Sequence, residues 1–131
     1  MKPVNATIAP APDALEEFWQ VSRKHVGYAA FEALLGSVAH STIQPPAFQY
    51  SEDARQADAW VEQLKTTGKA VLVTPLGDFP YGDLPHQGDL AIVCDGRGIP
   101  AALALTVEVT RESDTVHEHL TLVYPQLAGQ K

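Results

Sequence analysis

Residues 84–109, LPHQGDLAIVCDGRGIPAALALTVEV, decide which fold this chain is expected to adopt. Two apolar runs, residues 90–94 and 99–109, flank a short polar segment that starts with Asp95-Gly96. Asp-Gly between apolar runs is a strong hairpin signal, because both residues tolerate the positive φ that tight hairpin turns require. Gly98 can supply a second residue with positive φ. The stretch therefore predicts a turn, a strand, a two-glycine hairpin turn and a second strand.

Three helices are predicted before this hairpin. In the first, from Asp13 to about residue 24, apolar side chains recur at helical spacing, and Asp13 with Glu16 has the spacing of a capping box. The second is expected over residues 29–39. The third has Ser51 as its expected N-cap and Gly68 as the residue that follows its end. Residues 1–12 are expected to fray, and residues 40–50, which contain two adjacent prolines, to form a linker.

Strands dominate after Gly68. Residues 70–74 predict a buried strand, residues 75–88 a loop, and residues 115–124 a last strand that ends before Pro125. Helices followed by a small, mostly antiparallel sheet indicate an α+β protein with a curled sheet or a β-barrel. A chain of 131 residues is long enough for one domain with one core.

Composition and charge limit the classes of partner. The formal net charge of −7 argues against a protein that grips long duplex nucleic acid, which needs a basic face, but it leaves room for a nucleoside or a short RNA in a local pocket. No apolar run approaches the ~20 residues of a membrane span, and residues 1–12 lack the apolar core of a signal peptide. The single cysteine, Cys94, is expected to fill the core. We therefore expect a cytoplasmic protein that does not bind membranes.

The order of several motifs resembles the ASCH family of the PUA-like superfamily. The similar stretch covers roughly residues 47–111 and includes Phe48-Gln49-Tyr50, the helix with Trp60, Gly68-Lys69, the "LPxxGD" motif and the "DGxGxP" motif. The resemblance implies a PUA-like β-barrel and a single ASCH-like domain over residues 1–131. In that domain, residues 13–46 are a helical extension and residues 47–124 are the core. It also implies that the chain binds or processes a nucleoside or RNA.

The residues that carry catalysis in the family are mostly missing here. In catalytic relatives, a Gly-x-Lys-x-x-Thr strand and an acidic motif after the sheet line a cleft. Here Lys69 follows Gly68 directly. Counted from Gly68, Ala70 and Val73 stand where the family has lysine and threonine, whereas in a register shifted by one residue Lys69 takes the lysine position and Leu72 the threonine position. Thr74 is the nearest hydroxyl, but a shift of one residue along a strand points a side chain to the other face. The acidic motif is absent.

Two residues remain candidates for catalysis, Lys69 and Glu108. A lysine whose pKa is lowered by burial can act as a base or nucleophile, and a carboxylate can relay protons. The alternative interpretation is structural: Lys69 is a solvated residue just past a helix, and Glu108 lies on the solvent face of a strand. We expect no cofactor.

Four residues are candidates for ligand binding. Thr74 lies near the family threonine position, and Asp78 and Tyr81 belong to the loop 76–87, in which aromatic rings beside carboxylates can hold a base by stacking and by hydrogen bonds. The same loop can instead be anchored by aromatic rings that pack on the sheet. His86 is the fourth candidate, and its alternative interpretation is an exposed turn residue.

A metal site is not expected. His117 and His119 would share one face of a strand, as metal ligands often do, but nothing in the spacing demands a third ligand. Exposed polar residues on a strand are the preferred interpretation.

Three functions stay open on the sequence alone. The preferred one is an ASCH-like module that binds a small ligand or RNA and has lost the catalytic residues of the family. The second is a hydrolase of the amidohydrolase or ribonuclease type that acts on a modified nucleoside or RNA. The third is a protein–protein interaction domain, which includes a homodimer formed through the N-terminal helices.

Overall fold

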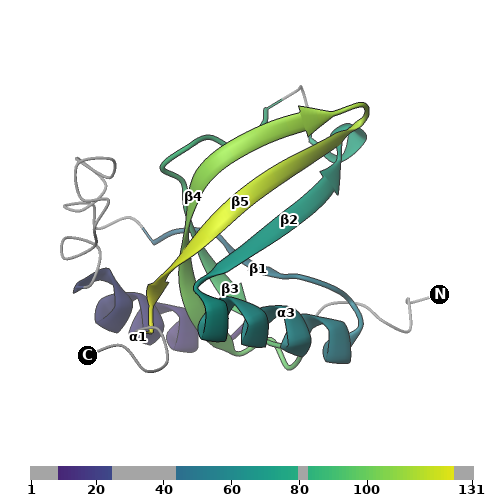
Figure 1. Cartoon of the computed structure of the whole chain (residues 1–131). Helices are drawn as coiled ribbons and strands as arrows, with labels where there is room; N and C mark the ends of the chain where they lie inside the picture. Colours follow the sequence, from purple (N-terminus) through teal and green to yellow (C-terminus); the bar gives the residue numbers. More distant parts are fainter. Residues whose placement is uncertain (1–8, 25–43, 80–82, 126–131) are drawn as a thin grey trace.

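The predicted hairpin forms the centre of the fold, with β3 (Leu90–Cys94) and β4 (Pro100–Glu112) paired antiparallel. The structure is a computed structural model that describes residues 9–24, 44–79 and 83–125. Figure 1 shows a sheet curled into a half-barrel, with α1 (Pro12–Ser22) and α3 (Ala54–Thr67) packed near one end. The prediction of an α+β fold with a curled, mostly antiparallel sheet is therefore confirmed. Neither of these helices has the length and apolar content needed to cross a bilayer.

The sheet has five strands in the order β1-β3-β4-β5-β2. The strands β4 and β5 (Thr115–Tyr124) form a long hairpin, and β2 (Lys69–Pro75) pairs antiparallel with β5. The only parallel pair among these strands is β1 (Ala47–Gln49) with β3. The strand β1 lies within the predicted linker 40–50, so that prediction was wrong for these residues. A strand of three residues is too short to show an alternating pattern in the sequence.

The starts of both helices differ from the prediction. The N-cap of α1 is Ala11, with no capping side chain, so the expected capping box of Asp13 and Glu16 does not form. The N-cap of α3 is Asp53 and not Ser51, because the Asp53 carboxylate accepts hydrogen bonds from the backbone N–H groups of the first turn. Gly68 ends α3 with a φ of 79°, as the sequence predicted. The predicted helix over residues 29–39 lies outside the described residues.

The central strand β4 is buried on both faces. Alternate side chains of a strand point to opposite faces, so Ala102 and Ala104 face α3, whereas Leu103 and Leu105 pack against Trp19 of α1. The small side chains lie on the side where α3 packs. The buried members of the α3 cluster are Trp60, Val61, Leu64, Ala70, Val93, Ala102, Ala104 and Leu120.

The strand β2 lies at the edge of the sheet, and the prediction that this strand is buried was wrong. Only Ala70 is buried, while Val71 and Val73 on the opposite face are 40% and 50% exposed. The helix α3 covers the face that carries Ala70, and no described helix covers the other face of β2. An apolar run in the sequence cannot distinguish an edge strand from a central one.

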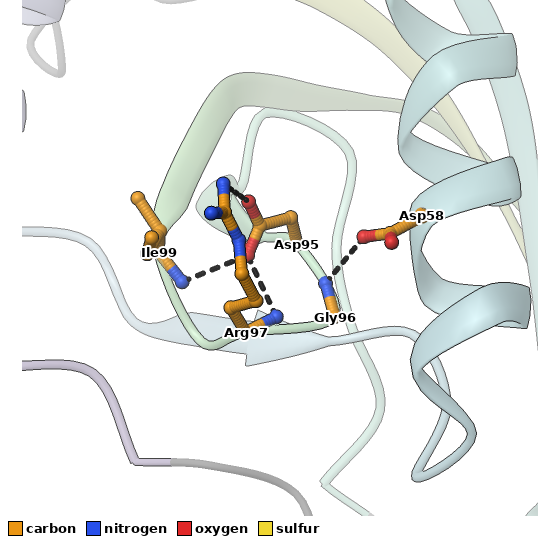
Figure 2. Close-up of polar contacts among 5 residues, drawn as sticks. All are labelled: Asp58, Asp95, Gly96, Arg97 and Ile99. Atoms are coloured by element: carbon orange, nitrogen blue, oxygen red, sulfur yellow. Dashed lines mark hydrogen bonds and ion pairs between the residues drawn. The ribbon is translucent and has the colours of Figure 1, made fainter.

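The turn between β3 and β4 is fixed from two sides (Figure 2). The Asp95 carboxylate accepts hydrogen bonds from the backbone N–H groups of Arg97 and Ile99, at 2.8 and 3.0 Å. The Gly96 N–H donates to the Asp58 carboxylate of α3, at 2.7 Å. Of the two turn glycines only Gly98 has a positive φ, at 77°. Gly96 is instead required by close packing, because a Cβ there would lie 2.5 Å from the backbone oxygen of Ala54.

The thiol of Cys94 lies in the core, as predicted, and is 1% exposed. Burial, assisted by the neighbouring Asp95 carboxylate, raises its pKa from 9.0 to about 11. This rise lowers the fraction of thiolate near pH 8 by roughly 100-fold compared with a cysteine of unshifted pKa. Only the thiolate reacts, so the thiol becomes less reactive by the same factor.

We therefore expect iodoacetamide to label the native protein at least 100-fold more slowly than the urea-unfolded protein at pH 8. The native rate should rise steadily up to about pH 11, the pKa of this thiol. Comparable labelling rates for native and unfolded protein at pH 8 would contradict this burial.

Candidate functional site

An open groove lies between the turn at residues 85–87 and the strand β4. Its volume is about 620 Å³, within the range of small-molecule sites. Two of the residues predicted from the sequence, His86 and Glu108, line the same groove. The described residues that line it are Pro85, His86, Gln87, Val107, Glu108 and Val109.

The "LPxxGD" motif forms the turn that holds one wall of this groove. The Asp89 N–H donates to the His86 carbonyl oxygen at 3.1 Å, and the His86 N–H donates to the Asp89 carboxylate at 2.8 Å. Gly88 has a φ of 99°, which only glycine adopts readily at the third position of a β-turn. The motif's glycine and aspartate therefore shape the turn, and its two variable positions, His86 and Gln87, are both exposed.

Backbone hydrogen bonds attach this turn to β4. The Gly88 N–H donates to the Thr106 carbonyl oxygen, and the Thr106 N–H donates to the Asp89 carbonyl oxygen, both at 2.8 Å. These bonds place His86 and Gln87 beside the stretch of β4 that follows Thr106. The groove is therefore built on a strand at the centre of the sheet, although one of its walls is a turn.

A shift in strand register places Glu108 at the groove. Thr106 lies opposite Leu120 of β5, but Glu108 lies opposite His119, so Val107 is an extra residue in β4. In a regular strand, Glu108 would share a face with Thr106 and lie opposite Glu118. The extra residue turns Glu108 to the other face of the sheet.

The same shift separates two carboxylates. Val109, and not Glu108, lies opposite Glu118, which avoids two like charges directly across a strand pair. The buried Thr106 hydroxyl donates a hydrogen bond of 2.5 Å to the Glu118 carboxylate. The sheet therefore holds Glu118 on the α3 side and leaves Glu108 exposed on the opposite side, at the groove.

The groove offers three kinds of polar group close to apolar ones. Glu108 supplies a carboxylate that accepts hydrogen bonds, Gln87 an amide that both donates and accepts, and His86 an imidazole. Among the described residues that line the groove, none is Lys or Arg. These groups suit a neutral or cationic polar molecule with N–H groups, and the described lining supplies no Lys or Arg to neutralise a phosphate.

The other predicted site residues lie elsewhere. Lys69 is exposed at the start of β2, and the Thr67 hydroxyl bonds to both of its backbone groups. Thr74 lies on the opposite face of β2 from Lys69, because the two residues are five positions apart in a strand. Asp78 is exposed in the short helix η3 (Leu76–Asp78) beyond the end of β2. None of these three lines the groove, and Tyr81 lies outside the described residues.

The sequence analysis missed Gln87, and it considered His119 only as a possible metal ligand. Gln87 occupies the second variable position of the "LPxxGD" motif, and this position was a usable signal because it sits next to the predicted His86. His119 is the cross-strand neighbour of Glu108 and shares its face. No signal in the sequence shows that Glu108 and His119 are neighbours, because their pairing depends on the extra residue at Val107.

The two histidines considered as metal ligands both lie on β5. His117 and His119 do share a face of β5, as expected, and His117 contacts the Thr115 hydroxyl at 3.1 Å. No group of three His, Cys, Asp or Glu side chains within residues 9–24, 44–79 and 83–125 is arranged to hold a metal ion.

Comparisons of the chain with protein-family models, with curated proteins and with solved structures gave no match.

Proposed function

We propose that this chain is a binding module for a small nitrogen-rich molecule of the nucleoside class, and that the groove between residues 85–87 and β4 holds it. The observation that carries the proposal is the convergence of His86, Gln87 and Glu108 on one groove of suitable volume. These side chains come from a turn and a strand that backbone hydrogen bonds hold together.

The chemistry of the three side chains matches the edge of a nucleobase. A glutamate accepts hydrogen bonds from an exocyclic amine such as that of cytosine, and a glutamine can both donate to and accept from an adenine edge. An imidazole ring offers a flat surface for stacking on a base. Val107 and Val109 add apolar contacts beside these groups.

A nucleoside fits this groove better than a nucleotide or an RNA strand. Phosphate recognition depends on Lys, Arg or the positive end of a helix, and the described residues that line the groove include neither Lys nor Arg. The Glu108 carboxylate repels a phosphate, and the chain as a whole carries a net charge of −7. The resemblance of residues 47–111 to the ASCH family supports the same ligand class.

The placement of Lys69 favours binding over hydrolysis. A lysine base or nucleophile must reach the substrate within hydrogen-bond distance. Lys69 is not part of the groove that Glu108 lines, and Thr74 lies on the other face of β2. A binding role needs only the groove residues, whereas the hydrolase alternative needs Lys69 to act at a second place.

The proposal is tested by titrating nucleosides into the wild-type protein and into Glu108→Ala. We expect cytidine or adenosine to bind more tightly than uridine, and each more tightly than its 5′-monophosphate. Loss of the Glu108 hydrogen bond should weaken binding by about 10-fold, the lower end for a charged hydrogen bond at an exposed site. Calorimetry or the ligand-dependent rise in Tm measures both effects.

Glu112→Ala is the matched control. Glu112 is an exposed glutamate on the same strand, but it does not line the groove, so its removal should leave affinity unchanged. Equal losses in the two variants, or no binding of any nucleoside, would refute the proposal. Product formation that is lost in Lys69→Ala would instead support the hydrolase alternative.

A further inference from the structure

The free edge of β2 exposes backbone groups in a regular pattern. In an antiparallel pair, alternate residues point their N–H and C=O groups toward the partner strand. The Gly68 carbonyl oxygen accepts a hydrogen bond from the Leu122 N–H of β5, at 2.9 Å. The even-numbered residues of β2 therefore point their backbone N–H and C=O groups toward β5. Those of Lys69, Val71 and Val73 point away from it.

Several of these outward groups already have partners. The Thr67 hydroxyl bonds to the N–H and the carbonyl oxygen of Lys69, at 3.2 and 2.9 Å. The Trp60 indole N–H donates to the Val71 carbonyl oxygen, at 3.2 Å. Pro75 has no N–H to donate. Among the described residues, no hydrogen bond is made by the Val71 N–H or by either backbone group of Val73.

This open segment of the edge is also apolar. Val71 and Val73 are 40% and 50% exposed and lie on the same face of β2. Proteins usually protect an edge strand with charges, proline or a covering element, because an exposed apolar edge pairs with other strands. Here a lysine and a proline protect the two ends of β2, and between them the Val71 carbonyl oxygen is the one outward backbone group with a described partner.

We propose that β2 pairs with β2 of a second copy of this chain, antiparallel, with the two-fold axis at Val73. Each Val73 N–H then donates to the carbonyl oxygen of the other copy's Val73, and each Val71 N–H donates to the carbonyl oxygen of the other copy's Pro75. The two sheets become one continuous sheet across the axis.

This register matches the donors and acceptors of the edge. The Val71 carbonyl oxygen, already bound to Trp60, lies opposite Pro75, which has no N–H. A register with the axis at Leu72 would place the Val73 N–H opposite that occupied oxygen. It would also place Pro75 opposite Lys69, whose N–H is bound to Thr67.

Charge complementarity selects a second copy over an unrelated peptide. The antiparallel arrangement brings the Lys69 end of one β2 to the Asp78 end of the other. Both residues are exposed and opposite in charge, and the two-fold axis creates this contact twice. The groove lies on the far side of β5, at β4, and stays free in this dimer.

Cysteine crosslinking tests the register. Residues that exchange both hydrogen bonds across an antiparallel pair have Cα atoms about 5.5 Å apart, within the disulfide range. We expect Val73→Cys to form a disulfide-linked dimer under mild oxidation. Val71→Cys is the matched control, since it lies opposite Pro75 and should not crosslink to itself. The native Cys94 is buried and does not compete. Failure of Val73→Cys to crosslink, or equal crosslinking by Val71→Cys, would overturn the proposal.

The mass of the particle in solution tests the dimer independently. Light scattering of the wild type should give about twice the 14.1 kDa chain mass at high concentration. Val73→Lys places two like charges at the axis and should shift the protein to a monomer. Thr110→Lys adds the same charge on the same face, two strands away, and should not. A monomeric wild type, or a Val73→Lys dimer, rules the interface out, with circular dichroism used to verify that each variant is folded.

Discussion

The substitution Gly96→Ala is expected to lower the free energy of unfolding by about 3 kcal/mol, a large effect for a single methyl group. A Cβ at this position would lie 2.5 Å from the backbone oxygen of Ala54 and 2.8 Å from its Cα. A backbone atom cannot rotate away as a side chain can, so the hairpin turn must move away from α3. That movement also strains the hydrogen bond between the Gly96 N–H and Asp58, shown in Figure 2.

Thermal or urea unfolding of Gly96→Ala measures this loss, with an expected fall in Tm of roughly 10 °C. Gly77→Ala is the matched control, because a Cβ at Gly77 meets no atom within 4 Å. That variant should be neutral, or more stable by about 0.5 kcal/mol through a less flexible unfolded chain. Similar stability of the two variants would show that the turn does not pack against α3 as described.

The elements with local signals were the ones that the sequence predicted well. The helix α3 has an apolar stripe with Ala57, Trp60 and Leu64, and it ends at a glycine, so its core face and its end follow from helix geometry alone. The β3–β4 hairpin likewise depends on a turn of five residues. The strand β1 and the edge position of β2 depend instead on which strands pair, and that is decided by contacts far apart in the sequence.

The sequence predicted individual residues of the candidate site, but it did not predict that they lie close together. His86 and Glu108 were chosen for their chemistry, but their meeting depends on the turn bonds to Thr106 and on the extra residue Val107. A shift of one residue moves every later side chain of a strand to the other face of the sheet. Sequence reasoning that assumes regular alternation therefore cannot place Glu108, and it cannot separate Lys69 from the groove.

The second large effect is expected from Leu103→Ala in β4. Leu103 is fully buried on the α1 side, where it packs with Trp19 and Leu105. Removing its side chain leaves a cavity between a helix and the central strand of the sheet, and the paired strands on both sides prevent the backbone from closing it. Leucine-to-alanine changes at such sites cost about 3 kcal/mol, and incomplete collapse raises the cost.

Ile99→Ala distinguishes this cavity from a general effect of removing an aliphatic side chain. Ile99 immediately precedes β4 and is 46% exposed, so its truncation should cost no more than about 1 kcal/mol. Urea unfolding should show a lower midpoint for Leu103→Ala with an unchanged slope, which separates lost stability from a changed unfolded state. Equal midpoints in the two variants would mean that α1 does not cover this face. The opposite face of β4 would then carry the core alone, through Ala102, Ala104 and the helix α3.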